Sequence, residues 1–259
     1  MRGDAARGAG AAAPAGDGAR ARNRRRRERA YLDAAMQIAA ADGLATLTMS
    51  RLAEEVDAAI GTVYTYFPSK GALMAELQRE AVERLTASYH LVRDRSEVEL
   101  AGWDDPQAVA VARLAVFGGF WIAAVDSLPQ EASLLHGLVS VSEVFVPPEE
   151  RHRVLPAALA LLGEARAAVA GAVEVGAVRV DDPIAVVVRW AASLTGVLLT
   201  ANLAPVEVVV IDPRLLAAQL QRDLLLGWGA PGALVDRAEA HVDALAAGGP
   251  LAPPPPDDA

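Results

Sequence analysis

The chain has 259 residues, of which 53% are hydrophobic and 22% are charged, enough for one large or two small domains with a buried core. It contains no cysteine, which excludes disulfides, thiolate nucleophiles and cysteine-based metal sites. Its net charge of −9 divides unevenly, because residues 1–95 carry +3 and residues 96–259 carry −12. A small part that tolerates polyanions therefore precedes a larger acidic part, which favours two domains with different partners.

Other composition features exclude further classes of protein. The four histidines are scattered without metal-ligand spacing, so we expect no metal site and no cofactor. The longest apolar run contains Arg113 and ends near Asp126, short of the roughly 18 clean apolar residues that a membrane span needs. The first 20 residues lack the apolar segment of a signal peptide. These features predict a cytoplasmic protein with no membrane partner.

Both ends of the chain have a biased composition. Residues 1–22 are mainly Gly, Ala and Arg, which predicts a disordered arm, and seven arginines lie between Arg20 and Arg29. Residues 248–259, which end in "LAPPPPDDA", are predicted to form a disordered Pro-rich tail that is solvated and cannot be helical.

Between these ends the apolar residues recur with helical periodicity, which predicts an all-α fold. The run "VEVVVID" at 206–212 is flanked by prolines, so we expect a short extended connector there instead of a strand. Three short helices are expected to precede six or seven longer ones. The predicted helices are 25–42, 48–56, 60–66, 69–95, 106–126, 129–146, 149–176, 183–203, 213–228 and 232–247.

The first three helices have the pattern of a helix-turn-helix. Gly43 suits the left-handed residue that ends the first helix, whose apolar stripe includes Leu32 and Ala35. Thr48 is placed to cap the second helix, with Leu47 and Leu52 at the spacing of a hydrophobic staple. A turn of about three residues separates this helix from the third, which would enter the major groove of DNA.

The third helix combines a buried edge with a polar surface. Val63 and Phe67 lie at i and i+4, so they are expected to face the core. Lys70, the only lysine of the chain, falls in the first turn of the next helix, where a cation opposes the helix dipole unless a phosphate lies there. The remaining side chains are expected to face phosphates or base edges: Ile60, Gly61, Thr62, Tyr64, Thr65 and Tyr66.

Each of these assignments has a structural alternative. Tyr64 could be a core aromatic residue, and the arginine run could serve only as a solubilising tail. If the run binds DNA, its arginines add phosphate or minor-groove contacts and steepen the salt dependence of binding; the candidates are Arg25, Arg26 and Arg27.

The stretch "TLTMSRLAEEVDAAIGTVYTYFPSKGALMAEL" at 46–77 resembles the signature of the tetracycline-repressor (TetR) family of bacterial transcription regulators. A weaker similarity to later helices of the family covers "EVGAVRVDDP" at 174–183. The turn departs from the usual Gly-Val-Ser, since it reads Asp57-Ala58-Ala59, although Asp tolerates a left-handed conformation. Gly71 replaces a common acidic residue. The resemblance implies that these residues contact DNA: Thr48, Ser50 or Arg51, the third-helix residues from Ile60 to Tyr66 named above, and Lys70.

The resemblance also implies a helix-turn-helix domain at 23–70 and a ligand-binding and dimerisation domain at 71–247. The aromatic side chains of the second domain are concentrated in one region, which favours a ligand pocket there: Trp103, Phe117, Phe120, Trp121, His136 and Phe145. Gly118 and Gly119 lie in the middle of a predicted helix, where each costs about 1 kcal/mol relative to alanine. Either a bound ligand or another helix packed closely against them would explain why glycine stands there. No charged residue is expected to be buried here, so the ligand should be largely apolar.

Dimerisation is expected through 183–203 and 213–228, because the first of these helices is apolar on nearly every side. A wholly buried helix within a monomer is the alternative. The sequence thus predicts a non-enzymatic homodimer that binds a palindromic operator on double-stranded DNA and is released from it by a small molecule. The alternatives are a ligand-independent DNA-binding dimer that acts through a protein partner, an activator and, least favoured, an all-α enzyme.

Overall fold

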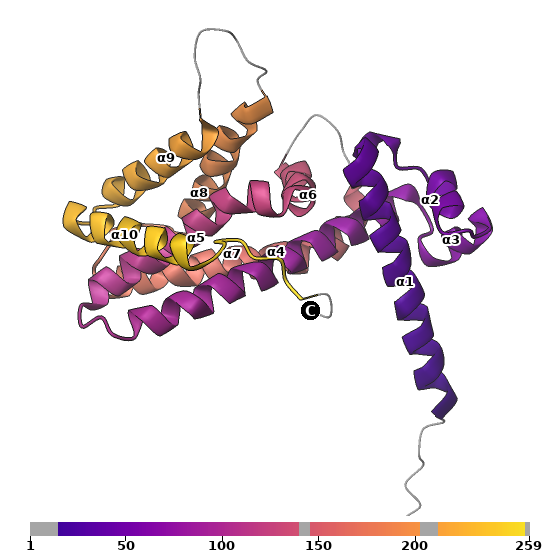
Figure 1. Ribbon diagram of the computed structural model, residues 1–259, viewed down its shortest axis with the longest axis horizontal. Coiled ribbons are helices and arrows are strands. Elements are labelled where there is room, and N and C mark those ends of the chain that lie inside the picture. The colour runs from indigo at the N-terminus through magenta and orange to yellow at the C-terminus, as the bar shows by residue number, and fades with distance from the viewer. Residues whose placement is uncertain (1–14, 140–145, 203–211, 257–259) are drawn as a thin grey trace, which may run out of the picture. The chain divides into compact units, whose positions relative to one another are not determined.

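The computed structural model describes residues 15–139, 146–202 and 212–256, and Figure 1 shows the arrangement of their helices. These residues form ten α-helices and three short 3-10 helices without any strand, which confirms the all-α prediction. The α-helices are α1 (Ala15–Asp42), α2 (Met49–Glu55), α3 (Ile60–Tyr66), α4 (Lys70–Leu100), α5 (Pro106–Ser127), α6 (Pro129–Val139), α7 (Arg151–Glu174), α8 (Pro183–Leu198), α9 (Pro213–Gly227) and α10 (Gly232–Gly248). Two compact units divide the chain, Met1–Lys70 and Gly71–Ala259.

The first unit contains the helix-turn-helix formed by α2 and α3. The side chain of Thr48 accepts a hydrogen bond from the backbone N–H of Arg51, so the predicted cap of α2 is confirmed. Asp57 has a φ of 46°, which is the left-handed conformation that the turn requires. Val63 and Phe67 are 0% and 1% exposed, as their spacing predicts. The buried edge of α3 thereby fixes which of its side chains reach the surface.

Helix α1 corrects the prediction of a disordered arm. It begins at Ala15, so residues 15–22 are helical, and the helix reaches Asp42 without interruption. The physical reason is that alanine and arginine are both strong helix formers, and a helix that is already nucleated by its packed end extends at little cost. The arginine run is therefore presented on a regular helix.

The second unit is built around α5, which packs against α6, α7, α8, α9 and α10 (Figure 1). Asp105 caps α5 by accepting hydrogen bonds from the backbone N–H groups of Gln107 and Ala108, and Pro106 occupies the first turn. By length and hydropathy, α5 and the segment Pro148–Glu174 could each cross a membrane. Because 67% of the apolar window of α5 is buried inside the unit, this helix is accounted for as a core helix.

The paired glycines of α5 are explained by helix packing. A Cβ at Gly118 would lie 2.6 Å from Nε2 of Gln221 on α9, and a Cβ at Gly119 would lie 3.0 Å from Val242 on α10. Neither position faces the cavity described below. Of the two explanations that the sequence leaves open, close packing of helices is the one that applies.

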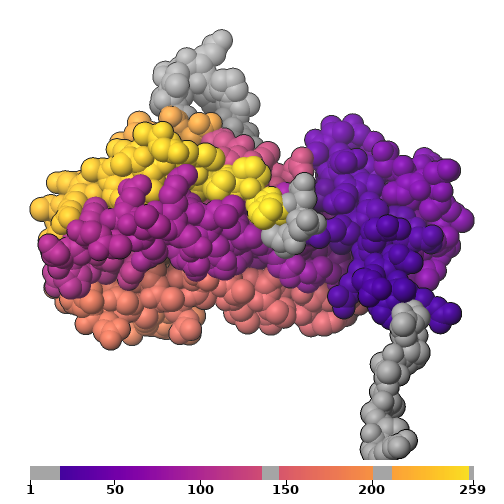
Figure 2. Space-filling model, turned by 60° about the horizontal axis from the view of Figure 1, so that its bottom comes forward, coloured from indigo at the N-terminus to yellow at the C-terminus, as the bar shows by residue number. Residues whose placement is uncertain are grey.

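The C-terminal segment is packed where a solvated tail is predicted, so that prediction is wrong for residues 249–256. Figure 2 shows the segment, in yellow, lying along α4, in magenta. Ser88 on α4 donates a hydrogen bond of 2.6 Å to the carbonyl oxygen of Pro253, and Ala252 is fully buried. The guanidinium of Arg95 binds the carbonyl oxygens of Leu245, Gly249 and Pro250. These partners on α4 are distant in sequence, so composition alone suggests a free tail.

Two sequence predictions fall partly outside the described residues. The predicted helix 129–146 is observed as far as Val139, and residues 140–145 are not described. Of the predicted extended connector at 206–212, residues 206–211 lie outside the described residues. From Pro183 the predicted helix 183–203 is α-helical to Leu198 and continues as a 3-10 turn, Leu199–Asn202.

Candidate DNA-binding surface and effector cavity

The exposed side of α3 carries the side chains that the sequence assigns to DNA. Ile60 and Tyr64 are 44% and 46% exposed, which is high for large apolar and aromatic residues. Gly61 and Thr65 are also exposed, and Thr62 is half-buried. A Cβ at Gly61 would meet nothing within 4 Å, so the backbone is open to a close approach by a phosphate. Thr65 donates to the carbonyl oxygen of Gly61 at 3.0 Å and keeps acceptor capacity.

The start of α2 offers a smaller set of groups. Thr48 and Ser50 are exposed. Arg51 forms an ion pair with Asp42 at the end of α1, so its guanidinium is engaged within the unit. Lys70 is exposed at the first position of α4, which places its cation at the positive end of that helix dipole. Of these residues, Lys70 is the cation best placed to gain from a nearby phosphate.

Tyr66 occupies a structural position that the sequence does not reveal. Its ring lies 5.0 Å from the ring of Tyr31 on α1 in an edge-to-face arrangement, and the guanidinium of Arg24 lies 5.5 Å from its centroid. Tyr66 is half-buried as a result. The ring joins α3 to α1, which makes Tyr64 the more accessible tyrosine. Further along α1, Arg25, Arg26 and Arg27 are all exposed.

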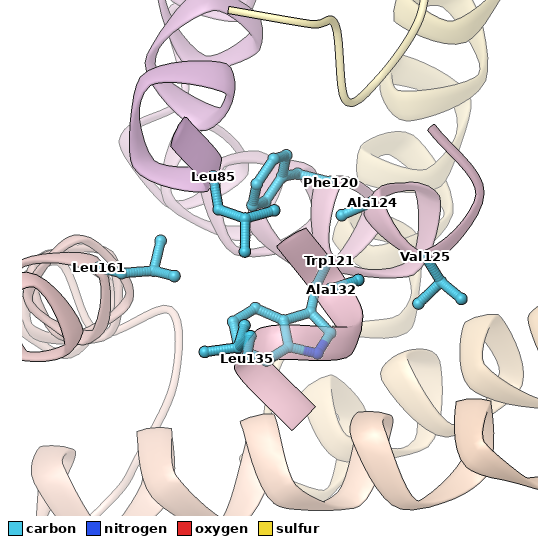
Figure 3. Close-up of a pocket in the computed structure, with 8 residues that line it drawn as sticks. All are labelled: Leu85, Phe120, Trp121, Ala124, Val125, Ala132, Leu135 and Leu161. Carbon is cyan, nitrogen blue, oxygen red and sulfur yellow. The ribbon is translucent and has the colours of Figure 1, made fainter. Parts of the chain in front are cut away.

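A small apolar cavity lies within the second unit (Figure 3). Eight side chains from α4, α5, α6 and α7 line it: Leu85, Phe120, Trp121, Ala124, Val125, Ala132, Leu135 and Leu161. Its volume of about 10 Å³ is close to the minimum that holds one water molecule. An organic ligand could therefore enter only if these side chains moved apart.

The cavity includes two of the six residues that the sequence proposes for the pocket, Phe120 and Trp121. Phe117 stacks on Trp121 with ring centroids 5.9 Å apart and lies in the adjoining core. Trp103 lies elsewhere, against His241 and beneath the guanidinium of Arg237 at 3.7 Å. The side chains of His136 and Phe145 are outside the described residues.

The other six lining residues are leucine, valine or alanine, which are common in any helical core. The sequence therefore does not distinguish them from other core residues. What selects them is the crossing of four helices. Only the aromatic pair on α5 stands out in the sequence.

Two polar side chains near the cavity, Trp121 and Glu131, are already paired. The indole N–H of Trp121 donates to Thr195 on α8 at 3.2 Å. Glu131, which precedes Ala132, is only 6% exposed and binds the guanidinium of Arg84 at 2.9 Å. The expectation that no charged residue is buried here is therefore wrong, because an ion pair that satisfies both partners permits burial. The cavity surface itself remains apolar.

Large apolar side chains are exposed on α8, on the 3-10 turn that follows it and on α9. Ile184 and Leu215 are 64% and 58% exposed, and four others exceed a third: Val188, Leu199, Leu216 and Leu226. The opposite side of α8 is buried through Val187, Trp190 and Leu194. An apolar surface of this kind on two adjacent helices is typical of an interface.

Comparison with known proteins gives one family match. Residues 32–77 match the N-terminal domain of the bacterial regulatory proteins of the tetR family. The HTH-type transcriptional repressor KstR of Mycolicibacterium smegmatis is 41% identical over 56 residues, which is 22% of this chain. The matched region spans 28% of the length of that relative.

Solved structures resemble the chain over most of its length. RolR in complex with the ligand resorcinol has a TM-score of 0.54 and 18% identity, covering 84% of this chain and 95% of its own. A transcriptional regulator from Saccharomonospora viridis in complex with choline has a TM-score of 0.55 and 19% identity, covering 78% and 96%. A TetR-family regulator from Rhodococcus sp. has a TM-score of 0.54 and 21% identity, covering 78% and 98%.

At these identities the structural likeness shows the fold, and the match at residues 32–77 coincides with the helix-turn-helix. Residues 32–77 therefore identify an N-terminal domain of the tetR family of bacterial regulatory proteins.

Proposed function

We propose that the chain is a DNA-binding transcriptional repressor that acts as a homodimer and leaves a palindromic operator when a small, largely apolar molecule binds. The observation that carries this proposal is the exposed surface of α3. A helix of a helix-turn-helix that leaves Ile60 and Tyr64 in solvent beside an unobstructed Gly61 has the surface needed to contact base edges and phosphates.

The apolar surface of α8 and α9 supports the homodimer. Packing these helices of two copies around a two-fold axis would cover Ile184, Val188 and Leu215. A two-fold protein presents its two recognition helices to two half-sites separated by about one DNA turn or a small multiple. This symmetry is the reason for proposing a palindromic operator.

The cavity supports regulation by a ligand. Its lining is apolar, and Glu131 is paired with Arg84, so an uncharged aromatic molecule suits it better than a cation does. Because the cavity has a volume of only about 10 Å³, a ligand must separate Leu85 on α4 from Trp121 on α5 or Leu161 on α7. Helix α4 is continuous from Lys70 to Leu85 and beyond, so moving Leu85 is the proposed route by which binding changes the DNA-binding state.

The small size of the same cavity favours a second candidate function. A DNA-binding dimer that recruits a protein partner needs no ligand and would have a filled core like this one. The two candidates differ in whether any small molecule lowers the affinity for DNA.

The first experiment selects bound sequences from a randomised duplex library with the full chain and measures affinity for the selected duplex by fluorescence anisotropy. We expect Tyr64→Ala to weaken specific binding at least tenfold. Val98→Ala should leave it unchanged, because this side chain on α4 is 79% exposed and contacts nothing that the proposal uses. If no sequence is enriched, or if both variants bind as the wild type does, the proposed DNA contact is wrong.

The ligand is tested on the same complex with resorcinol and choline as contrasting probes, followed by a panel of small aromatic molecules. Release of DNA by an aromatic probe together with a change in tryptophan fluorescence supports the repressor. Failure of the whole panel to change either signal supports the ligand-independent candidate.

A further inference from the structure

The arginines of α1 are divided between two sides of the helix. Arg20, Arg24 and Arg27 stand at i, i+4 and i+7, and the next position of this series, i+11, is Tyr31. Tyr31 is 7% exposed and Ile38, one further step along the same side, is 3% exposed. This side of α1 is therefore the one that packs against α2 and α3 further along the helix.

The other arginines of the run face elsewhere. At 3.6 residues per turn, four arginines lie on the opposite half of the helix surface: Arg22, Arg25, Arg26 and Arg29. They are exposed, as are the three on the side of Tyr31. Composition and exposure therefore do not distinguish the two sets, and only the register of the helix does.

Contacts with α3 fix the position of the first set. The guanidinium of Arg24 lies 5.5 Å from the ring of Tyr66, the last residue of α3, and that ring packs edge-to-face on Tyr31. Arg24 is thus held beside the end of the recognition helix. Arg20 is one turn further out, about 6 Å along the axis, and Arg27 is about 4.5 Å in the other direction.

We propose that Arg20, Arg24 and Arg27 form a phosphate-binding track that extends the DNA contact of α3 onto the flanking backbone. This inference rests on the proposed function, because it requires α3 to occupy the major groove. With α3 there, a cation beside Tyr66 lies next to the strand that borders the groove. The three side chains span about 10 Å, the axial length of about three phosphates at 3.4 Å per nucleotide of one strand.

The helical state of this segment decides the kind of contact. A helix with its side chains is about 10–12 Å in diameter, whereas the minor groove is about 6 Å wide. Residues 18–27 are helical, so they cannot thread into the groove as an extended arm would. The track therefore binds phosphates, contributes affinity and salt dependence, and reads no bases. The sequence alone suggests Arg25, Arg26 and Arg27 as DNA contacts. The proposed track keeps Arg27 and replaces Arg25 and Arg26 by Arg20 and Arg24.

Two triple variants of equal charge test the proposal. One is Arg20→Ala/Arg24→Ala/Arg27→Ala, and its control is Arg22→Ala/Arg25→Ala/Arg26→Ala. Alanine is the best helix former, so both variants should keep α1 helical, which circular dichroism of the full chain checks. Affinity for the selected duplex is measured from 50 to 300 mM NaCl, and the slope of log affinity against log salt concentration is compared.

Each lost phosphate contact lowers the slope by about 0.9, so we expect the first variant to lose about 2.7 per protomer. The control should keep a slope within about 1 of the wild type, since its arginines contribute only a diffuse field. Equal slopes for the two variants would overturn the track, while the wild type would still bind its selected sequence. A wild type that enriches no sequence would instead overturn the proposed function together with the track.

Discussion

Substituting Gly118 on α5 by alanine tests the packing that joins α5, α8 and α9. Gln221 on α9 accepts a hydrogen bond of 2.5 Å from the indole N–H of Trp190 and donates one of 3.3 Å to the carbonyl oxygen of Leu114. Trp190 is 1% exposed and Gln221 is 7% exposed, so neither could turn to solvent without unpacking. The carboxamide passes directly over Gly118, where the added Cβ would lie 2.6 Å from Nε2.

The expected loss of stability follows from three effects. Overpacking a buried site costs about 1–3 kcal/mol. Displacing the carboxamide leaves the buried indole N–H of Trp190 unsatisfied, at a further cost of about 1–3 kcal/mol. Replacing glycine by alanine inside a helix returns about 1 kcal/mol. The net loss is about 3 kcal/mol, which lowers the Tm of a unit of this size by about 6–12 °C.

Thermal and urea unfolding followed by circular dichroism measure this loss, with Gly163→Ala on α7 as the matched control. A Cβ at Gly163 would meet nothing within 4 Å, so this variant should gain about 0.5–1 kcal/mol. A second check places Gly118→Ala in a Gln221→Ala background, where the added methyl should cost far less. If Gly118→Ala is as stable as Gly163→Ala, or costs the same in both backgrounds, Gln221 does not have the role assigned to it.

Three further outcomes are expected. Ile184→Glu should convert the proposed dimer to a monomer in sedimentation experiments without unfolding it, because this side chain is 64% exposed. An unchanged sedimentation coefficient would place the proposed interface elsewhere. Burial lowers the pKa of His241 below its usual 6.5, with Glu99 opposing the shift. The unfolded chain then binds the proton more readily than the folded chain does. The stability that this residue contributes is therefore present above about pH 6.5 and is lost as the pH falls below that value. In a pH series of urea unfolding, His241→Gln should lose less stability at low pH than the wild type does. Ending the chain at Gly249 exposes the surface of α4 around Ser88 and should speed hydrogen exchange of its backbone amides, whereas equal exchange rates would mean that the segment contributes nothing to α4.

Much of this molecule was predictable from its sequence. Periodicity located the helices because an apolar stripe must repeat every 3.6 residues to be buried, and local chemistry marked several of their ends, as Thr48 does for α2. The burial of Val63 and Phe67, and with it the exposed side of α3, followed from the same rule. These features depend on neighbours within one or two turns, which is the range over which a sequence is informative.

The tertiary structure decided which distant residues meet. It placed Gln221 over Gly118, so the glycine pair serves helix packing, and it assembled the cavity from four helices whose lining residues are mostly ordinary core types. It turned a predicted solvated tail into a segment held by Ser88 and Arg95, and it used Tyr66 to fix one side of the arginine run beside α3. In each case the partner lies tens of residues away or more, and the contact depends on how helices cross. Composition and residue spacing do not reveal how the helices cross, so these features could be identified only in the tertiary structure.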